Sequence, residues 1–345
     1  MLLSTAPFVY AGEQTSSLPY SLSLNTTFHM PKFPSPVAIR SCLESLLLSS
    51  KASGSTNPCD SLLNATALYQ LTRYEIASIV APVAAYWLYC VFLHYVAPVL
   101  PFLDRYRLPT NQPRRPKNRV SVGEVVRAVI IQHTLQMVLA TILAVVTHDP
   151  VEANRIEHPA VMTLKVVAGM VVIDTWEYWL HRWMHTNPWL YRNFHSVHHR
   201  ITENFSFAAL YNHPLEGLVL DSLGGAVASL VTFMSPLTSA VFFTVATLKT
   251  VDDHSGYRWP WVEAIFANNA QYHDVHHWGK GIKYNFDQPF FIIWDNLCGT
   301  RWTFDDKDLP EDASNQAATF GKSSLFSSDA RQRTPKTSDD KGKDD

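Results

Sequence analysis

The chain has 345 residues, 47% of them hydrophobic and 17% charged, with a formal net charge of −2 at pH 7. The last 41 residues hold 17 of the 58 charged side chains. The first 304 residues are therefore only about 13% charged, against about 25% in soluble domains. We expect a membrane protein with a polar tail. The near-neutral charge, without clustered basic and aromatic residues, excludes nucleic acid as a partner.

Three apolar runs predict membrane-spanning helices. Ile76 to Leu103 carries no formal charge over 28 residues, and about 20 suffice to cross a bilayer. Ala128 to Thr147 is a second uncharged run. Pro159 to Leu180, which has three charged residues, predicts a third span that becomes polar at its far end. The connection Asp104 to Arg119 carries six basic residues and one acid, so the positive-inside rule places it in the cytosol.

Histidines form three clusters in the second half of the chain, where ten of the fifteen lie. His181 and His185 have H-x-x-x-H spacing. Residues three or four apart share one face of a helix, so such imidazoles can aim at a common point. Imidazole binds iron, zinc, copper and nickel, and eight or more exceed what one tetrahedral zinc uses, so we expect two metal ions. The other two clusters have H-x-x-H-H spacing: His195, His198 and His199; and His273, His276 and His277.

The fourth uncharged run, Ser222 to Leu248, is too short for two complete crossings. A single crossing would separate His273 from His181 by the membrane, and both must lie on one side to share a site. We therefore expect a hairpin of two short or tilted helices that turns at Pro236 and extends upstream into Leu215 to Leu220.

With its three histidine clusters and their flanking residues, the chain resembles the fatty acid hydroxylase superfamily of membrane di-iron oxygenases, which includes sterol desaturases and sphingolipid hydroxylases. Four strings between Asp174 and Trp302 are most similar to sphinganine C4-hydroxylases: Asp174 to His185, Thr250 to Tyr257, Asn268 to His277 and Gly281 to Phe291. The resemblance implies an all-α integral membrane protein, a transmembrane helical bundle with a cytosolic helical cap that holds a histidine-rich dimetal site.

The same resemblance adds His254 to the expected metal ligands. Fatty acyl 2-hydroxylases of the superfamily carry a further histidine where this chain has Thr250, which leaves the coordination of one metal open. His213 is a possible substitute, or a surface or supporting group. Three aspartates beside the ligands are expected to orient imidazoles, since carboxylates commonly accept the second ring N–H. They are Asp252, Asp253 and Asp274, and binding of a substrate amine is an alternative role for the first two.

The resemblance further implies hydroxylation at C4 of a sphingoid base, converting sphinganine or dihydroceramide to phytosphingosine or phytoceramide, with two iron ions and O2. Hydrogen abstraction from a methylene and hydroxyl rebound would complete this reaction. The sequence has neither a His-Pro-Gly-Gly haem motif nor a nucleotide-binding glycine motif, so we expect electrons from a separate partner. The resemblance implies that this partner is cytochrome b5 with its NAD(P)H-linked reductase. The alternatives are a sterol or fatty acyl desaturase or hydroxylase and, more remotely, a zinc-dependent membrane hydrolase or a metal transporter.

We expect four segments along the chain: a lumenal segment (1–75), two transmembrane helices with a basic cytosolic loop (76–158), the fatty acid hydroxylase catalytic domain (159–302) and a disordered cytosolic tail (303–345). Glycosylation sequons at Asn25 and Asn64 agree with a lumenal N-terminal segment. The terminal lysines Lys341 and Lys343 resemble a dilysine retrieval signal, which predicts the endoplasmic reticulum membrane.

Overall fold

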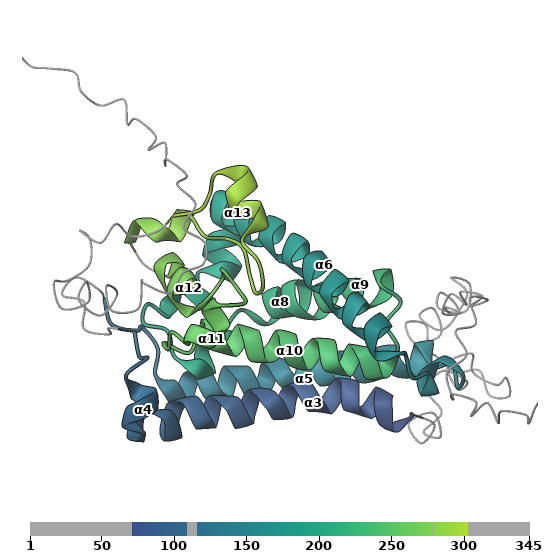
Figure 1. Ribbon diagram of the computed structural model, residues 1–345. Coiled ribbons are helices and arrows are strands. Elements are labelled where there is room, and N and C mark those ends of the chain that lie inside the picture. Colours follow the sequence, from purple (N-terminus) through teal and green to yellow (C-terminus); the bar gives the residue numbers. More distant parts are fainter. Residues whose placement is uncertain (1–70, 109–115, 278, 303–345) are drawn as a thin grey trace, which may run out of the picture.

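The computed structural model describes residues 71–108, 116–277 and 279–302, and every regular element in these ranges is a helix. The long helices α3 (Arg73–Val91), α5 (Val122–Thr147) and α10 (Pro236–Asp253) run alongside one another, and α6 (Pro159–Thr186) lies obliquely over them (Figure 1). The expectation of an all-α fold is confirmed. The expected N-terminal segment up to residue 70 and the expected tail from residue 303 lie outside the described residues.

Four helical segments of the described ranges are long and apolar enough to cross a membrane. They are Arg73–Val99, Val122–Thr147, Pro159–Thr186 and Pro214–Val231. The chain is therefore a multi-pass membrane protein. The first three segments confirm the expected spans, although α6 continues to Thr186 and so carries His181 and His185 on its last turns.

Local sequence explains where two of these helices begin. Thr72 and Glu75 form a reciprocal capping box at α3, and Ser121 and Glu124 form another at α5. In the second box the Ser121 N–H donates to Glu124 at 2.8 Å and the Glu124 N–H donates to the Ser121 hydroxyl at 3.3 Å. This box lies ahead of the uncharged run, so α5 begins at Val122 rather than at the expected Ala128.

The expected hairpin is present, and its limbs are longer than the uncharged run. The first limb consists of α8 (Pro214–Gly217), a π-helical turn (Leu218–Leu223) and α9 (Gly224–Val231), and α10 is the second limb. Glu216, near the start of the first limb, and Asp252 and Asp253, at the end of α10, are buried, so the helices continue past the uncharged run at both of its ends. Of the two limbs, only the first, Pro214–Val231, is among the described segments that are long and apolar enough to cross a membrane, which agrees with the expectation that the run does not make two complete crossings.

Polar contacts hold the hairpin turn at the end of the bundle where α6 begins. Lys165, near the start of α6, donates to the Phe233 carbonyl and pairs with Glu157. The Ser235 hydroxyl donates to the same Glu157 carboxylate at 3.2 Å. The hairpin thus extends along α6 from the histidine end of the bundle to its opposite end (Figure 1).

One hydrophobic core joins the first two helices to the histidine-bearing segment. Tyr86, Val129, Ile201 and Val251 are fully buried members of the same cluster. The Tyr86 hydroxyl also donates to the Phe207 carbonyl at 2.7 Å. The core therefore crosses the boundary expected after residue 158, and α3 and α5 form one wall of the body that carries the histidines.

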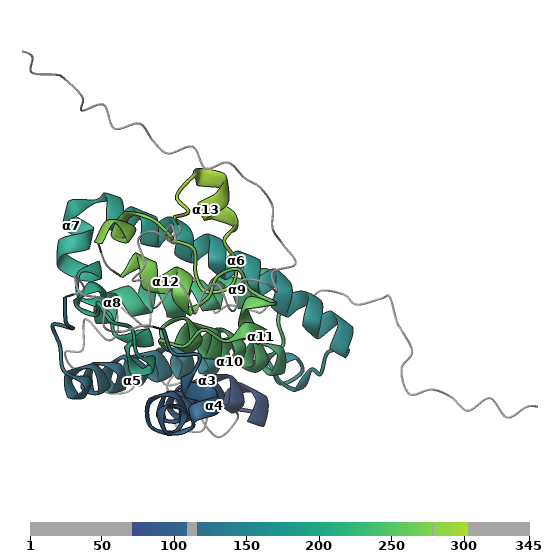
Figure 2. The ribbon, with the colours of Figure 1, turned by 60° about the vertical axis from the view of Figure 1, so that its left-hand side comes forward.

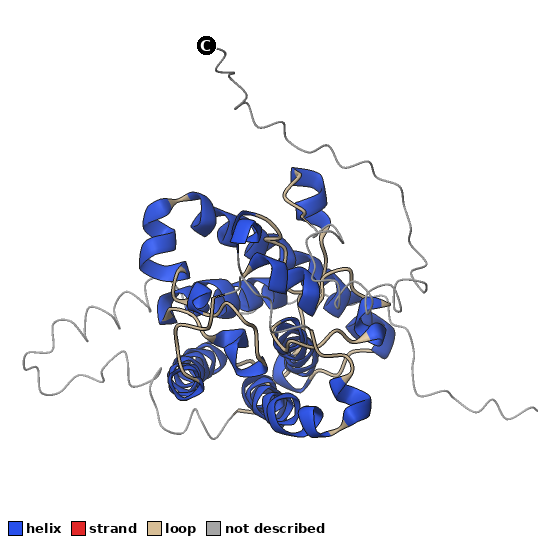
Figure 3. Cartoon of the chain, turned by 90° about the vertical axis from the view of Figure 1, so that its left-hand side faces the viewer, coloured by secondary structure: helices blue, strands red, loops and turns tan. Residues whose placement is uncertain are grey.

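Short helices gather at one end of the bundle and form the helical cap. They include α4 (Pro101–Asp104), α11 (Pro260–Glu263), α12 (Ala270–His276) and α13 (Ile293–Cys298). Figure 2 shows α12 and α13 beside the histidine end of α6. Figure 3 views the molecule from this end, along the long helices, with loops and short helices around the described bundle.

Candidate metal centre

The nine histidines that the sequence singles out as ligands come together in two groups. In each group, one ring nitrogen from every member lies within 4.8 Å of the others. All nine rings are buried except that of His185, which is half-buried. The five-histidine group contains His181, His185, His195, His199 and His276. The four-histidine group contains His198, His254, His273 and His277.

Helical spacing distributes the rings between the two groups. His181 and His185 are four apart on α6 and enter the same group, as expected. The second cluster does not lie on a regular α-helix, because a π-helical turn ends at His195 and a 3-10 turn begins at His198. This change of winding directs His195 and His199 to one group and His198 to the other.

Backbone carbonyls fix the orientation of five rings. The Nδ1–H groups of His181, His198 and His254 donate to the carbonyls of Phe286, Tyr211 and Thr250 at 2.9, 2.9 and 2.8 Å. His276 and His277 make equivalent bonds of 2.6 and 2.8 Å. A carbonyl can only accept, so Nδ1 carries the hydrogen and the Nε2 atom of each neutral ring presents a lone pair.

The Nε2 atoms converge within each group. His181 and His195 are separated by 3.0 Å between Nε2 atoms, and His198 and His254 by 3.4 Å. Two nitrogens bound about 2.1 Å from one ion lie about 3.0–3.4 Å apart at octahedral or tetrahedral angles. Lone pairs facing each other at this distance repel unless a cation lies between them. The donor set therefore fits a metal ion in each group.

Burial keeps these rings neutral, which is the form that binds metal. It lowers the pKa of His198 to about 4 and the pKa values of His195 and His254 to about 3. The pKa of His276 is also lowered, by burial and by the neighbouring His181 ring. In the described part of the chain the buried His276 Nε2 atom has no hydrogen-bond partner, so a ligand atom is left facing the five-histidine group.

Glu216 holds a ring that no carbonyl holds. Its carboxylate accepts the His195 Nδ1–H at 2.5 Å, and both side chains are 2% exposed. The spacing of the histidines does not single out Glu216. The available signal was an acidic residue three positions after His213, ahead of an apolar run. A buried acid in an apolar segment is costly and commonly has a specific partner.

The remaining predicted residues lie beside the groups. His213 belongs to neither, since its ring accepts the Leu215 N–H at 3.2 Å at the start of α8. Thr250 supplies the carbonyl that holds His254, and the four-histidine group contains no side chain from either position.

None of the three predicted aspartates holds a ligand ring in the described structure. Asp252 accepts from the Tyr89 hydroxyl at 3.2 Å, and Asp253 pairs with Lys249. Asp274 accepts from the Asn204 amide at 3.3 Å. The orienting role expected of these aspartates belongs instead to Glu216 and to backbone carbonyls.

Sequence comparison agrees with this geometry. The model of the fatty acid hydroxylase family matches residues 166–300. Sphinganine C4-monooxygenase 1 of Arabidopsis thaliana is 46% identical over 230 residues, which are 66% of this chain and 87% of the relative. The chain belongs to the fatty acid hydroxylase family. No solved structure matches it.

Two further relatives carry different names. Sphingolipid C4-hydroxylase of Schizosaccharomyces pombe is 37% identical over 270 residues, covering 68% of this chain and 92% of the relative. A very-long-chain aldehyde decarbonylase of Oryza sativa subsp. indica is 46% identical over 227 residues, covering 65% of this chain and 87% of the relative. Membership of the family therefore leaves two reactions to be distinguished.

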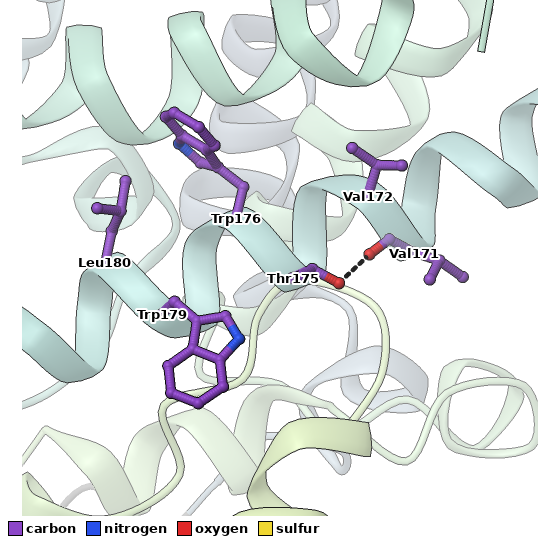
Figure 4. A pocket seen from close by; sticks show the side chains of 6 residues that line it. All are labelled: Val171, Val172, Thr175, Trp176, Trp179 and Leu180. Carbon is purple, nitrogen blue, oxygen red and sulfur yellow. Dashed lines mark hydrogen bonds between the residues drawn. The ribbon is translucent and has the colours of Figure 1, made fainter. Parts of the chain in front are cut away.

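An apolar groove of about 480 Å³ lies on the side of α6 that faces away from the histidines (Figure 4). Trp179 on this groove is 46% exposed, whereas Glu177 and His181, each two residues away, are 7% and 1% exposed. Residues two apart on a helix point about 200° from one another, so the groove and the histidines lie on opposite sides of α6. The groove opens to the outside of the helical bundle. It is lined by Val171, Val172, Thr175, Trp176, Trp179 and Leu180.

Proposed function

We propose that this hydroxylase introduces a hydroxyl group at C4 of a sphingoid base, forming phytosphingosine from sphinganine or phytoceramide from dihydroceramide, in sphingolipid biosynthesis. The observation that carries the proposal is the convergence of nine histidines in two groups at the end of a membrane bundle. Similarity to C4-monooxygenases and C4-hydroxylases supports the position of the hydroxyl.

Iron suits the two groups because the reaction requires redox chemistry, which zinc lacks. Two bound irons would supply oxidation of an unactivated C–H bond by O2, with one oxygen atom entering the product and the other leaving as water. This stoichiometry consumes two electrons and two protons. The proposed ligands are the members of the five-histidine and four-histidine groups.

The chain's own residues prepare the site in four ways. Carbonyls such as that of Phe286 orient the rings, and burial keeps the rings neutral and excludes bulk water. The Glu216 carboxylate brings a negative charge to His195 and makes that ring a better donor toward metal. Helix α6 carries ligands of the five-histidine group, and α12 carries ligands of both groups, so these side chains project from rigid elements.

Electrons come from outside the chain in this proposal. Cytochrome b5 with its NAD(P)H-linked reductase is the proposed donor, in the endoplasmic reticulum membrane with the histidine end of the bundle in the cytosol. In support, the Arg119 N–H donates to the Arg200 carbonyl at 2.9 Å, which joins the basic connection to the second histidine cluster. A basic surface at this end would attract an acidic electron donor.

The test is mass spectrometry of long-chain bases in cells that lack their own C4-hydroxylase. The full chain should produce 4-hydroxysphinganine, and His276→Ala should abolish it, because the variant removes a buried ring of the five-histidine group. His213→Ala is the matched control, since this ring lies outside both groups, and should retain most activity. Product from His276→Ala equal to that of the unaltered chain would refute the site.

The aldehyde decarbonylase relative, at 46% identity, defines a second reaction to test. The same cells should be analysed for alkanes after a long-chain aldehyde is supplied. Alkane formation that depends on His276, without any 4-hydroxysphinganine, would show that the metal centre catalyses aldehyde decarbonylation and not C4 hydroxylation. A hydroxyl or double bond elsewhere on a lipid, or an oxidised sterol, would keep the oxygenase and change its substrate.

A further inference from the structure

Acidic side chains lie inside the bundle next to the five-histidine group. Glu177 on α6 is one turn before His181 and on the same face, and it is 7% exposed. Asp221 lies in the π-helical turn five residues after Glu216, the residue that holds His195. Glu177 and Asp221 lie near each other across the contact between α6 and the first hairpin limb, where the Trp176 indole donates to the Val219 carbonyl at 3.0 Å.

These carboxylates have few partners in the described structure. Among the described residues Glu177 has no hydrogen bond or ion pair, and its charged neighbours Asp221 and Asp174 are themselves acidic. Asp221 Oδ2 and Glu216 Oε2 are buried oxygens without a hydrogen-bond partner in the same part of the chain. The lysines enclosed in the described bundle are already paired, Lys249 with Asp253 and Lys165 with Glu157. The region therefore holds two acidic groups, Glu177 and Asp221, that no protein cation balances.

Uncharged polar groups are aimed at the same region. Gln132 on α5 is 1% exposed, and both its amide nitrogen and its amide oxygen lack partners among the described residues. A Cβ atom at Gly217 would lie 2.2 Å from the Gln132 amide nitrogen and 2.8 Å from the Asn212 amide oxygen. Glycine at 217 thus leaves room for both amides beside Glu216. Asn212 also neighbours the Asp221 carboxylate.

A buried charge without a partner is costly, and so is a buried amide that makes no hydrogen bond. Carboxylates and amides without partners, gathered next to a metal centre, indicate a ligand that is cationic and carries hydroxyl groups. Lipid chains approach from the bilayer, and the carboxylates are on the bundle side of the histidines, so the ligand's polar head has to reach the inside of the bundle.

We propose that Asp221 and Glu177 bind the protonated amine of a free sphingoid base, and that Gln132 and Asn212 bind its hydroxyl groups. This inference rests on the proposed C4 hydroxylation. In a sphingoid base the amine is on C2, two carbons from C4. An ammonium bound by Glu177, one turn before His181, and by Asp221, five residues after the Glu216 that holds His195, would bring C4 toward the five-histidine group. A ceramide has an uncharged amide at C2, so this site selects the free base over the N-acylated lipid.

The variants Asp221→Asn and Glu177→Gln remove each charge and keep the shape of the side chain. They should be assayed on purified full-length protein supplied with O2, NAD(P)H, cytochrome b5 and its reductase, once with sphinganine and once with N-acetylsphinganine, whose nitrogen is uncharged. We expect each variant to raise KM for sphinganine at least tenfold with a smaller change in kcat, because a charge-assisted hydrogen bond is lost. KM for N-acetylsphinganine should stay within about twofold of its unaltered value, and Asp221→Glu should recover part of the loss for sphinganine.

Glu152→Gln is the matched control, since this acid lies on the surface and pairs with Arg155. It should leave both substrates unaffected. Iron content measured on the same samples should be unchanged in Asp221→Asn and Glu177→Gln. Loss of iron would overturn the proposal, because the carboxylates would then balance the metal charge. Equal losses for both substrates would also overturn it, since the site would not discriminate the amine.

A binding measurement separates this inference from the proposed reaction. Sphinganine should raise the Tm of the unaltered protein more than N-acetylsphinganine does, and Asp221→Asn should remove the difference. This result without any 4-hydroxy product from either lipid would keep the amine site and refute the reaction. Hydroxylation of sphinganine with no difference in Tm between the two lipids, and with unchanged KM in both variants, would keep the reaction and refute the amine site.

Discussion

Glu216 is the carboxylate that touches a ring of the two histidine groups in the described structure. Its bond to His195 is 2.5 Å long and fully enclosed. A carboxylate in this position fixes the ring tautomer and raises the basicity of the Nε2 atom that faces the metal. Its negative charge also offsets part of the metal charge in a region of low dielectric.

We predict that Glu216→Gln weakens metal binding by about 10- to 100-fold, because the amide can still orient His195 but brings no charge. The measurement is iron content after dialysis of purified protein against a graded series of chelator concentrations. Glu263→Gln is a suitable control, since Glu263 pairs with Arg258 away from both groups. Iron retention equal to that of the unaltered protein would show that Glu216 does not support the metal.

The sequence predicts eight of the nine histidines because their spacing is local and their number is unusual, and the family resemblance adds His254. It does not predict Glu216, which lies 21 positions from His195 and meets it only through the fold of the first hairpin limb. The sequence does not predict which backbone carbonyls accept the ring N–H groups either, since every residue has a carbonyl. Asp252 lies two positions before His254 in the sequence, which suggests that it holds that ring, yet its partner is Tyr89 on α3.

At the scale of elements, the segment after α12 supports the metal ligands through Asp295 of α13. The Asp295 carboxylate accepts the backbone N–H groups of Phe286 and Asp287 at 3.1 and 2.8 Å and the Tyr272 hydroxyl at 2.8 Å. These bonds fix the loop whose Phe286 carbonyl holds His181. The loop and α13 therefore act as one support for the cap.

Asp287 gives this support a pH dependence. Burial raises the pKa of Asp287 to about 8, and its Oδ1 atom has no partner among the described residues, as suits a protonated carboxyl. The folded chain binds this proton more tightly than the unfolded chain, whose pKa is near 3.8. The resulting stabilisation is complete below about pH 4 and is lost as the pH rises through about 8.

We therefore predict that Tm falls between pH 6 and pH 9 and that Asp287→Asn, which cannot titrate, shows a smaller fall. Each unit of pKa difference corresponds to about 1.4 kcal/mol of stability. Unfolding can be followed by thiol labelling, because Cys90 is fully buried in the folded protein. Asp104→Asn, on an exposed residue, should keep the unaltered profile. Parallel profiles for Asp287→Asn and the unaltered chain would contradict this assignment.

Helix boundaries show what composition can and cannot predict at this scale. The start of α5 at Val122 follows from the capping box at Ser121 and Glu124, a local signal that a search for uncharged runs overlooks. The hairpin limbs extend to Pro214 and Asp253 because their acidic residues face the interior of the bundle. Charge marks the end of a membrane helix only when that charge faces lipid.

At the scale of the whole molecule, the basic connection and the histidine groups lie at the same end of the bundle, so the orientation of the bundle in the membrane decides the side of the metal centre. Asn118 accepts from the Thr202 and Glu203 backbone N–H groups at 2.7 and 2.8 Å, so the basic connection and the second histidine cluster lie at the same end. The start of α3 lies at the other end, where Glu75 contacts His148 at 3.0 Å. The side of the membrane that holds the basic connection therefore also holds the metal centre.

The positive-inside rule assigns the basic connection to the cytosol, so the chain before α3 should be lumenal. We predict that both sequons, which lie outside the described residues, are glycosylated and that Asn25→Gln and Asn64→Gln each remove one glycosidase-sensitive shift in mass. In sealed microsomes a tag at the C-terminus should be open to protease, as the cytosolic tail requires. A protected tag together with unmodified sequons would show that the bundle has the opposite orientation in the membrane. Because the histidine centre and the basic connection share one end, that inversion would place the metal site in the lumen and remove cytosolic cytochrome b5 as its electron donor.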